Sequence, residues 1–252
     1  MKEKIKFKNN QGQHLAALLE FPDEKIIGYA IFAHCFTCNK NLTAVRNIGK
    51  ALNSKGIAVF RFDFTGLGES EGDFEDTNFT SNVDDLIAAA DYLKTNYKAP
   101  SILIGHSLGG AAVLFAKHQI PSIKAVVTIG APSNPSHVSH LFSGSVSKII
   151  ENGEAELSIG GRPFKIKEQF LNDIKSKKIE KVTVNLNVPL LIFHSPIDTT
   201  VEIENAAKIY KSAKHPKSFI SLDKADHLLS NKEDSEFVGL MISVWSKRYL
   251  ND

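Results

Sequence analysis

The 252-residue sequence contains only two cysteines, two methionines and one tryptophan, and it has no long apolar run. Two cysteines cannot form the disulfide framework of a small secreted scaffold. No segment reaches the roughly 20 apolar residues that a membrane-spanning helix requires. The charged residues among positions 1–8 exclude the apolar core of a signal peptide. We therefore expect a cytoplasmic protein without a membrane partner.

An excess of charge of one sign is also lacking. The 30 Lys and Arg residues nearly balance the 28 Asp and Glu residues, the net charge is +2, and the two kinds are mixed along the chain. This balance gives no basis for nucleic-acid binding. Hydrophobic residues make up 42% of the chain and charged residues 23%, which suits one large domain over residues 1–252.

A turn containing glycine and serine is the most informative stretch. The apolar run at 102–104 is typical of a strand buried on both faces, and it leads into Gly105-His106-Ser107-Leu108-Gly109 and a run of small residues. A strand, a Gly-x-Ser-x-Gly turn and a helix form a nucleophile elbow, which holds its serine on a strained turn. Glycines flank the serine because a Cβ there would crowd the neighbouring strand and helix. We predict that Ser107 is a nucleophile.

Strand-like and helix-like segments alternate along most of the chain. Residues 5–9 and 14–21 are expected to form a hairpin. Strands are predicted at 29–33, 57–62, 102–104, 125–129, 189–193 and 218–222, and helices at 42–54, at 81–97, after Ser107, at 202–212 and at 234–249. This alternation predicts an α/β fold with a mostly parallel, doubly wound sheet.

The alternation stops between residues 133 and 187, where the sequence is polar. A hairpin is expected at 155–166, turning at Gly160-Gly161, with helical segments at 135–142 and 167–177. This insertion would leave the sheet at the edge that carries Ser107, which makes it a candidate lid. The alternative is a surface excursion without a function.

A nucleophilic serine needs a base within hydrogen-bond distance, oriented by a third group. Among nine histidines, His227 follows the last predicted strand, at the same sheet edge as Ser107. Asp198 follows the preceding strand and completes the chain order Ser, Asp, His of hydrolases with this elbow. Asp223 is the fallback for the acid, and Asp226 is disfavoured because it adjoins His227. The predicted catalytic residues are therefore Ser107, Asp198 and His227.

A tetrahedral intermediate also needs two backbone N–H donors for its oxyanion. Leu108 is one candidate, at a helix start where N–H groups are unpaired, and Phe36, in the loop after strand 29–33, is the other. We expect Phe36, His34 and Phe142 to contact the substrate, and His34 to fix its loop through a hydrogen bond. The glycine-rich loop 66–72 has the wrong spacing for a dinucleotide. No metal and no other cofactor is predicted.

Four motifs, at 34–40, 61–72, 105–113 and 129–133, carry a family resemblance that covers nearly the whole chain. The chain resembles the α/β-hydrolases. More narrowly, it is similar to the hydrolase half of bacterial proteins in which this domain is fused to an OsmC-type hydroperoxide-reducing domain. The resemblance implies the α/β-hydrolase fold and ester hydrolysis through an acyl-enzyme, without a cofactor. The short insertion resembles the lid of small bacterial carboxylesterases, including cinnamoyl esterases and monoacylglycerol lipases.

Cys35 and Cys38 form a C-x-x-C pair that has three interpretations. In the first interpretation, they are two small buried side chains on a tight loop. Alternatively, they form a disulfide that shifts Phe36 and switches the oxyanion hole. A zinc site would need two more ligands at metal spacing, and none is obvious.

The sequence thus predicts a serine carboxylesterase for small or medium acyl or aryl esters. A thioesterase or an amidase would use the same residues, and a redox-responsive regulatory module based on Cys35 and Cys38 is the alternative from another class. A peptidase is less favoured because no acidic cluster on the insertion marks an amino-terminus site. The expected partner is a small-molecule ester, and the oligomeric state, monomer or homodimer, is left open.

Overall fold

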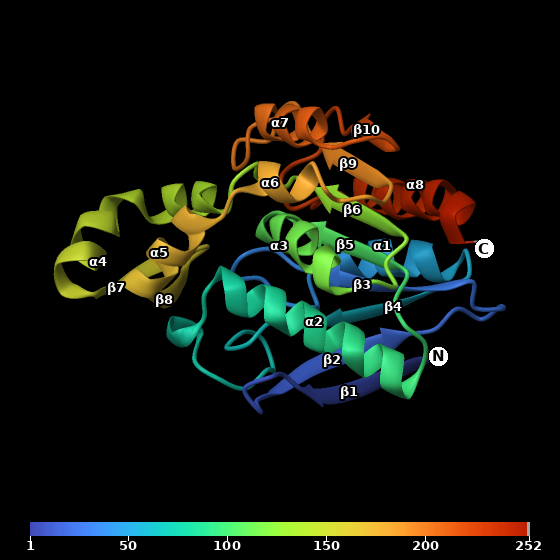
Figure 1. Ribbon diagram of the computed structural model, residues 1–252, viewed down its shortest axis with the longest axis horizontal. Helices are drawn as coiled ribbons and strands as arrows, with labels where there is room; N and C mark the ends of the chain where they lie inside the picture. The colour runs from blue at the N-terminus through green and yellow to red at the C-terminus, as the bar shows by residue number, and fades with distance from the viewer. Residues whose placement is uncertain (251–252) are drawn as a thin grey trace.

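The computed structural model describes residues 1–250, which form an eight-stranded sheet with helices on both faces (Figure 1). The strand order is β1-β2-β4-β3-β5-β6-β9-β10. β1 and β2 are antiparallel to each other, β2 is antiparallel to β4, and all other neighbours are parallel. The mostly parallel sheet predicted from the sequence is confirmed. Its strands are β1 (Lys2–Lys8), β2 (His14–Glu20), β3 (Gly28–Ala33), β4 (Ile57–Phe62), β5 (Ile102–His106), β6 (Ala125–Ile129), β9 (Leu190–His194) and β10 (Lys217–Ser221).

Helices cover the two faces of the sheet and close one apolar core on each side (Figure 1). Alternate residues of a buried strand enter different cores, so that in β3 Ile31 packs under α2 and α3 whereas Phe32 packs under α1 and α8. The sequence of a strand that is buried on both faces is therefore a continuous apolar run. The helices of these two layers are α1 (Thr43–Asn53), α2 (Phe79–Asn96), α3 (Leu108–Ala116), α7 (Glu204–Ser212) and α8 (Lys232–Leu250), with short 3₁₀ turns η1 (Phe74–Asp76) and η2 (Lys117–Gln119).

Helix α2 begins earlier than the sequence predicted. The expected start was Ser81, but the N-cap is Asn78. The Asn78 side chain accepts a hydrogen bond from the Ser81 amide at 2.9 Å, and the Ser81 hydroxyl accepts one from the Asn78 amide at 2.9 Å. Ser81 is thus the third residue of a reciprocal capping box rather than the cap itself.

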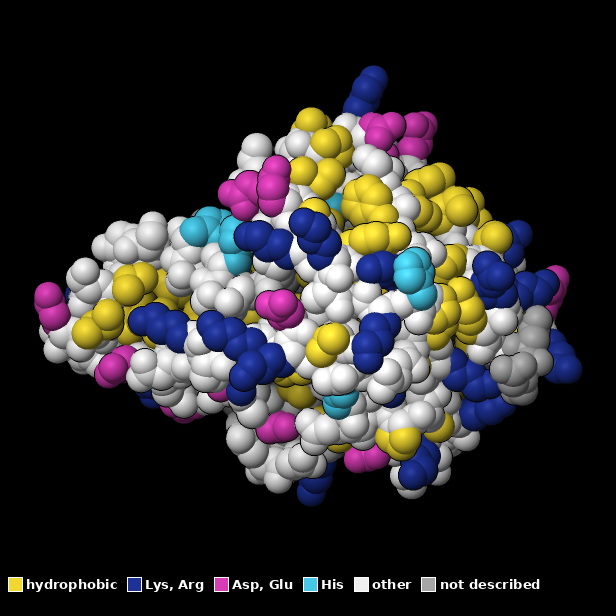
Figure 2. Space-filling model, turned by 45° about the horizontal axis from the view of Figure 1, so that its top comes forward, with side chains coloured by type: hydrophobic (Ala, Val, Ile, Leu, Met, Phe, Trp, Pro, Cys, Tyr) yellow, Lys and Arg dark blue, Asp and Glu magenta, His cyan; other side chains and the backbone are white. Residues whose placement is uncertain are grey.

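Residues 133–187 leave the sheet between β6 and β9 and project from one side of the molecule (Figures 1 and 2). The expected hairpin at 155–166 is present, and the segment expected to be helical at 135–142 is a 3₁₀ helix. Two short helices, α4 and α6, were not predicted. The elements of the insertion are η3 (Pro135–Ser145), α4 (Val146–Asn152), β7 (Glu154–Ile159), β8 (Arg162–Lys167), α5 (Glu168–Ser176) and α6 (Ile179–Thr183).

Aromatic rings join the insertion to the loop after β3. The ring of Phe36 lies 5.3 Å from Phe170 of α5 and 5.5 Å from Phe74 of η1, measured between centroids. Phe74 in turn lies 4.9 Å from Phe164 of β8. These contacts place the insertion over the sheet edge at which β5 ends. Within residues 1–250, no helix combines the length and the apolar character that crossing a bilayer demands.

Candidate active site

Ser107 occupies the turn between β5 and α3 with φ 55° and ψ −125°, a conformation that is strained for a residue with a side chain. Its amide donates to the Ile129 carbonyl at 2.8 Å, which fixes the turn to β6. A Cβ on Gly105 would lie 2.2 Å from the Gly109 carbonyl oxygen, so the strand and the helix approach each other too closely for any other residue. The predicted elbow geometry is therefore present around Ser107.

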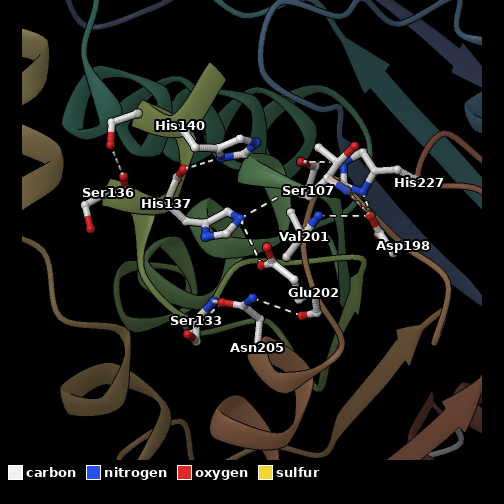
Figure 3. A network of polar contacts seen from close by, with 12 residues as sticks. Ser107, Ser133, Ser136, His137, His140, Asp198, Val201, Glu202, Asn205 and His227 are labelled. Carbon is white, nitrogen blue, oxygen red and sulfur yellow. Dashed lines mark hydrogen bonds and ion pairs between the residues drawn. The ribbon is translucent and has the colours of Figure 1, made fainter. Parts of the chain in front are cut away.

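Three side chains that are distant in the sequence meet at this edge of the sheet (Figure 3). The His227 Nε2 atom lies 3.0 Å from the Ser107 Oγ atom, and the His227 Nδ1 atom lies 2.7 Å from Asp198 Oδ2. Asp198 stands in the loop after β9, and His227 stands in the loop after β10. Parallel strands bring these loops together because their carboxyl ends share one edge. The arrangement can move a proton from a serine hydroxyl to an imidazole that a carboxylate orients.

Asp198 is held as a carboxylate. Burial alone would raise the pKa of Asp198, but the hydrogen bonds from His227 and from the amides of Val201 and Thr200 lower it below its ordinary value. The other acids considered from the sequence lie elsewhere. Asp223 is exposed, and Asp226 accepts a hydrogen bond from the Ser230 amide at 2.7 Å.

Two buried histidines that the sequence analysis did not single out fix the loops of this site. The His106 Nε2 atom lies 2.6 Å from the His227 carbonyl oxygen. Burial and then the neighbouring His227 lower the pKa of His106 to about 3, so His106 is neutral and donates to that carbonyl. His194 likewise lies 2.7 Å from the Val201 carbonyl, and burial lowers the pKa of His194 as well. The only sequence signal for them was a histidine at the carboxyl end of β5 and of β9.

The two residues whose amides are expected to bind an oxyanion both line the cavity that contains Ser107. Leu108 is the first residue of α3, and Phe36 lies in the loop after β3; both line the same cavity as Ser107 and His227. Within residues 1–250, no acceptor is hydrogen-bonded to the amide of either residue. Two unpaired N–H groups beside a serine hydroxyl can stabilise a developing negative charge on a carbonyl oxygen.

His34 and Phe142, expected to contact the substrate, lie behind the cavity wall instead. His34 is 1% exposed, bonds the Cys35 carbonyl at 2.9 Å through Nδ1 and packs on the ring of Phe64. Phe142 is 4% exposed and packs against Phe170. Neither side chain lines the cavity, contrary to the expectation of direct contact, because both are buried behind the residues that form its wall.

Cys35 and Cys38 are joined by a disulfide bond, with 5.2 Å between their Cα atoms. The interpretation as two free buried thiols is therefore wrong. The bond closes a tight loop in which Thr37 has φ 61°, and Phe36 lines the cavity beside Ser107 in this disulfide-bonded chain. That forming this disulfide shifts Phe36 and switches the oxyanion hole stays a prediction.

The cavity above Ser107 has a volume of about 700 Å³, within the usual range for small-molecule sites. The loop after β3 supplies one wall, and the insertion supplies another through His137, Val138, His140, Leu141 and Arg162. His137 hydrogen-bonds the Thr200 carbonyl at 3.1 Å and lies 3.7 Å from Glu202, which connects the insertion to the Asp198 loop (Figure 3). Within the part of the chain that the structure describes, no group of three or more His, Cys, Asp or Glu side chains could hold a metal ion.

The sheet order, the serine on the turn after β5, and the aspartate and histidine on the loops after β9 and β10 define an α/β-hydrolase. The model of the Hydrolase_4 family, described as "Serine aminopeptidase, S33", matches residues 31–165, more than half of the chain, and the chain belongs to this family. The protein is therefore a hydrolase of the α/β-hydrolase superfamily.

Known proteins with similar folds include enzymes of several kinds. The crystal structure of the esterase domain of a Rhodothermus marinus protein is 48% identical, with a TM-score of 0.82 over 100% of both chains. Est1E from Butyrivibrio proteoclasticus, solved with ferulic acid, is 22% identical, with a TM-score of 0.80 over 98% of this chain and 99% of that chain. The human palmitoyl-protein thioesterase ABHD10 is 24% identical over 217 residues, which cover 82% of this chain and 69% of ABHD10. The chain spans 61% of another curated relative, the uncharacterized protein YfhR of Salmonella typhimurium.

Proposed function

We propose that the protein is a serine carboxylesterase that hydrolyses small or medium acyl or aryl esters. One observation carries this proposal: Ser107 Oγ lies 3.0 Å from His227 Nε2, whose other ring nitrogen lies 2.7 Å from Asp198. The Rhodothermus marinus esterase domain, 48% identical over the full length, supports ester chemistry. The narrower similarity to the hydrolase half of OsmC fusion proteins, the cytoplasmic location and the oligomeric state stay predictions.

In the proposed reaction, His227 takes the proton of the Ser107 hydroxyl as its oxygen attacks the ester carbonyl carbon. The amides of Leu108 and Phe36 bind the oxyanion, and the Asp198 carboxylate stabilises the imidazolium. The imidazolium then gives its proton to the leaving alcohol, and an acyl group remains on Ser107. Water activated by His227 releases the acid. The insertion 133–187 acts as the lid that shields these steps.

Hydrolysis of 4-nitrophenyl acetate tests the proposal. Ser107→Ala should lower the turnover number by about a millionfold, because the nucleophile and its base act as one unit. Ser136→Ala is the matched control, since Ser136 lies in the insertion without contacting His227 and should keep the wild-type rate. Appreciable hydrolysis by Ser107→Ala would contradict the proposal. A panel of 4-nitrophenyl acyl esters and hydroxycinnamate esters then measures the acyl preference.

A thioesterase is the second candidate, favoured by the similarity to ABHD10, which is named a palmitoyl-protein thioesterase. The same serine, histidine and amides would act on a thioester carbonyl. Matched oxygen esters and thioesters of one acyl group separate the two activities. A kcat/KM that is higher for the thioesters across the series would replace the esterase proposal.

The disulfide between Cys35 and Cys38 favours regulation by the redox state. We propose that the oxidised form is the active one, because the bond constrains the loop that presents the Phe36 amide. A dithiol reductant would supply two electrons and two protons, break the Sγ–Sγ bond into two thiols, and become a disulfide itself. Activity should then fall, and Cys38→Ser should show the lower activity without a further response to the reductant. A wild-type rate that is unchanged after complete reduction would end this idea.

A further inference from the structure

Arg162 stands at the tip of the insertion hairpin, directly after the Gly160-Gly161 turn, and lines the cavity above Ser107. The Nη2 atom of Arg162 donates a hydrogen bond to the Thr37 carbonyl oxygen. Its guanidinium lies 5.3 Å from the centroid of the Phe164 ring, which supports it from the same hairpin. The charge is therefore held next to the loop that contains Phe36.

The charge of Arg162 is not neutralised. Within residues 1–250, no carboxylate lies within ion-pair distance of its guanidinium, and the cavity lining contains no Asp, Glu or Lys. Arg61 shows the contrast: it is buried, lies 2.9 Å from Glu20 and also donates to the Lys40 carbonyl. Arg61 is a paired structural arginine, whereas Arg162 is exposed and, among the described residues, is the only lining side chain of the cavity of about 700 Å³ with a fixed charge.

A guanidinium carries five N–H donors in a planar fork that matches a carboxylate or a phosphate. The Thr37 carbonyl accepts one bond from Arg162, so further donors remain for a ligand. Asn39, Thr43 and Thr200 add neutral polar groups to the same lining. Among residues 1–250, the lining has no acidic side chain that would repel an anion.

From this geometry we infer that the site takes esters that carry a second, anionic group, a carboxylate or a phosphate, which Arg162 binds while Ser107 faces the ester carbonyl. The inference rests on the proposed esterase function and names its substrate class. The anion would also bridge the tip of the insertion to the loop after β3, because the same guanidinium holds the Thr37 carbonyl.

Matched esters test the inference on both sides of the scissile bond. On the alcohol side the substrates are 4-acetoxybenzoate, 4-acetoxyphenyl phosphate and the neutral 4-acetoxybenzamide. On the acyl side they are mono-4-nitrophenyl adipate and the neutral 4-nitrophenyl hexanoate. We expect the wild type to prefer an anionic member of at least one set by about 10- to 100-fold in kcat/KM, the range of a charge-assisted hydrogen bond. The carboxylate and phosphate arms show which anion is preferred.

Arg162→Gln should abolish that preference through KM and leave kcat for the neutral esters within about threefold, while Arg162→Lys should retain part of it. Lys165→Gln is the matched control, because Lys165 lies on the same strand, pairs with Glu75 at 3.1 Å and does not line the cavity. Added salt should raise KM for the anionic ester in the wild type only.

Three outcomes would overturn the inference: no anionic preference in the wild type, a preference that survives in Arg162→Gln, or an equal loss for charged and neutral esters. The last result would make Arg162 a support for the Thr37 loop and nothing more. Failure of the esterase proposal is distinguishable, because no ester of either set, nor 4-nitrophenyl acetate, would then be hydrolysed. Thermal unfolding followed by circular dichroism verifies that each variant is folded.

Discussion

Replacing Gly109 by alanine would place a methyl group against the backbone of the central strand β3. An ideal Cβ on Gly109 lies 2.4 Å from the His34 carbonyl oxygen and 2.5 Å from the Ala33 carbonyl oxygen, whereas real Cβ atoms keep at least 3.0 Å. The shorter contact must open by 3.0 − 2.4 = 0.6 Å or more. The Ala33 oxygen cannot rotate away, because β3 is paired with β4 and β5 and Ala33 itself pairs with Gly105. His34 follows that strand directly.

Helix α3 must therefore move, at a cost of about 3 kcal/mol in the free energy of unfolding, the upper part of the range for an overpacked core. The same shift displaces the Leu108 amide and should lower kcat by roughly 10- to 100-fold. Gly144→Ala is the matched control, since an added Cβ there meets nothing within 4 Å. It should change stability by less than about 0.5 kcal/mol.

Urea unfolding monitored by circular dichroism, together with turnover of 4-nitrophenyl acetate, measures both effects. The reasoning predicts a low urea midpoint and slow turnover for Gly109→Ala, and wild-type values for Gly144→Ala. Equal midpoints and equal turnover in the two variants would show that the elbow adapts to a methyl group. The close packing of α3 on β3 would then not explain the glycine.

Three further predictions concern buried polar groups. Asp198→Asn should lower kcat by about 10⁴-fold without changing the fold, because His227 loses the acceptor that sets its tautomer. Steady-state kinetics measure kcat and circular dichroism measures the fold; a decrease in kcat of less than about tenfold contradicts this prediction. His106→Leu should lower kcat about tenfold or more, because the His227 carbonyl loses its donor, and His106→Gln should restore part of the loss if its amide reaches the same carbonyl. Burial raises the pKa of Asp85 to about 6 despite the hydrogen bonds from Thr65. The folded protein therefore binds this proton more tightly than the unfolded chain does. The resulting stabilisation is fully present below about pH 4, and about 3 kcal/mol of it is lost as the pH rises to about 6. The pH dependence of unfolding should lose this component in Asp85→Asn, and identical pH profiles would refute the assignment.

The central strands β3, β5, β6 and β9 could be predicted because each one is a local apolar run. The strand at 102–104 and its turn at Ser107 are encoded by eight neighbouring residues, and the structure has β5 and the elbow there. The helix start at Asn78 was missed because Ser81 is an equally good cap on propensity alone, and the reciprocal bonds that decide between them are visible only in the folded chain. The short helix α4 carries too few apolar residues to stand out from a loop.

The meeting of Ser107, Asp198 and His227 could be predicted from chain order, because the ends of parallel strands share an edge. The state of Cys35 and Cys38 could not, since a C-x-x-C spacing alone does not distinguish two thiols from a disulfide. The contact of Arg162 with Thr37 joins residues 125 positions apart in the sequence, and no periodicity links a hairpin tip to a distant loop.

Three loops carry the proposed chemistry, and in each of them a backbone carbonyl accepts a hydrogen bond from a side chain outside the loop. His106 at the end of β5 holds the His227 carbonyl, His194 at the end of β9 holds the Val201 carbonyl, and Arg162 at the hairpin tip holds the Thr37 carbonyl. The two histidines are buried and neutral, so they add no charge beside Asp198. Arg162 is the exception, because it keeps its charge and faces the cavity. The two rigid loops thus position the base and the acid, whereas the third loop is held in part by a side chain that a substrate anion can also bind. The Cys35–Cys38 disulfide also closes this third loop, so a substrate anion can bind Arg162 without displacing the Phe36 amide.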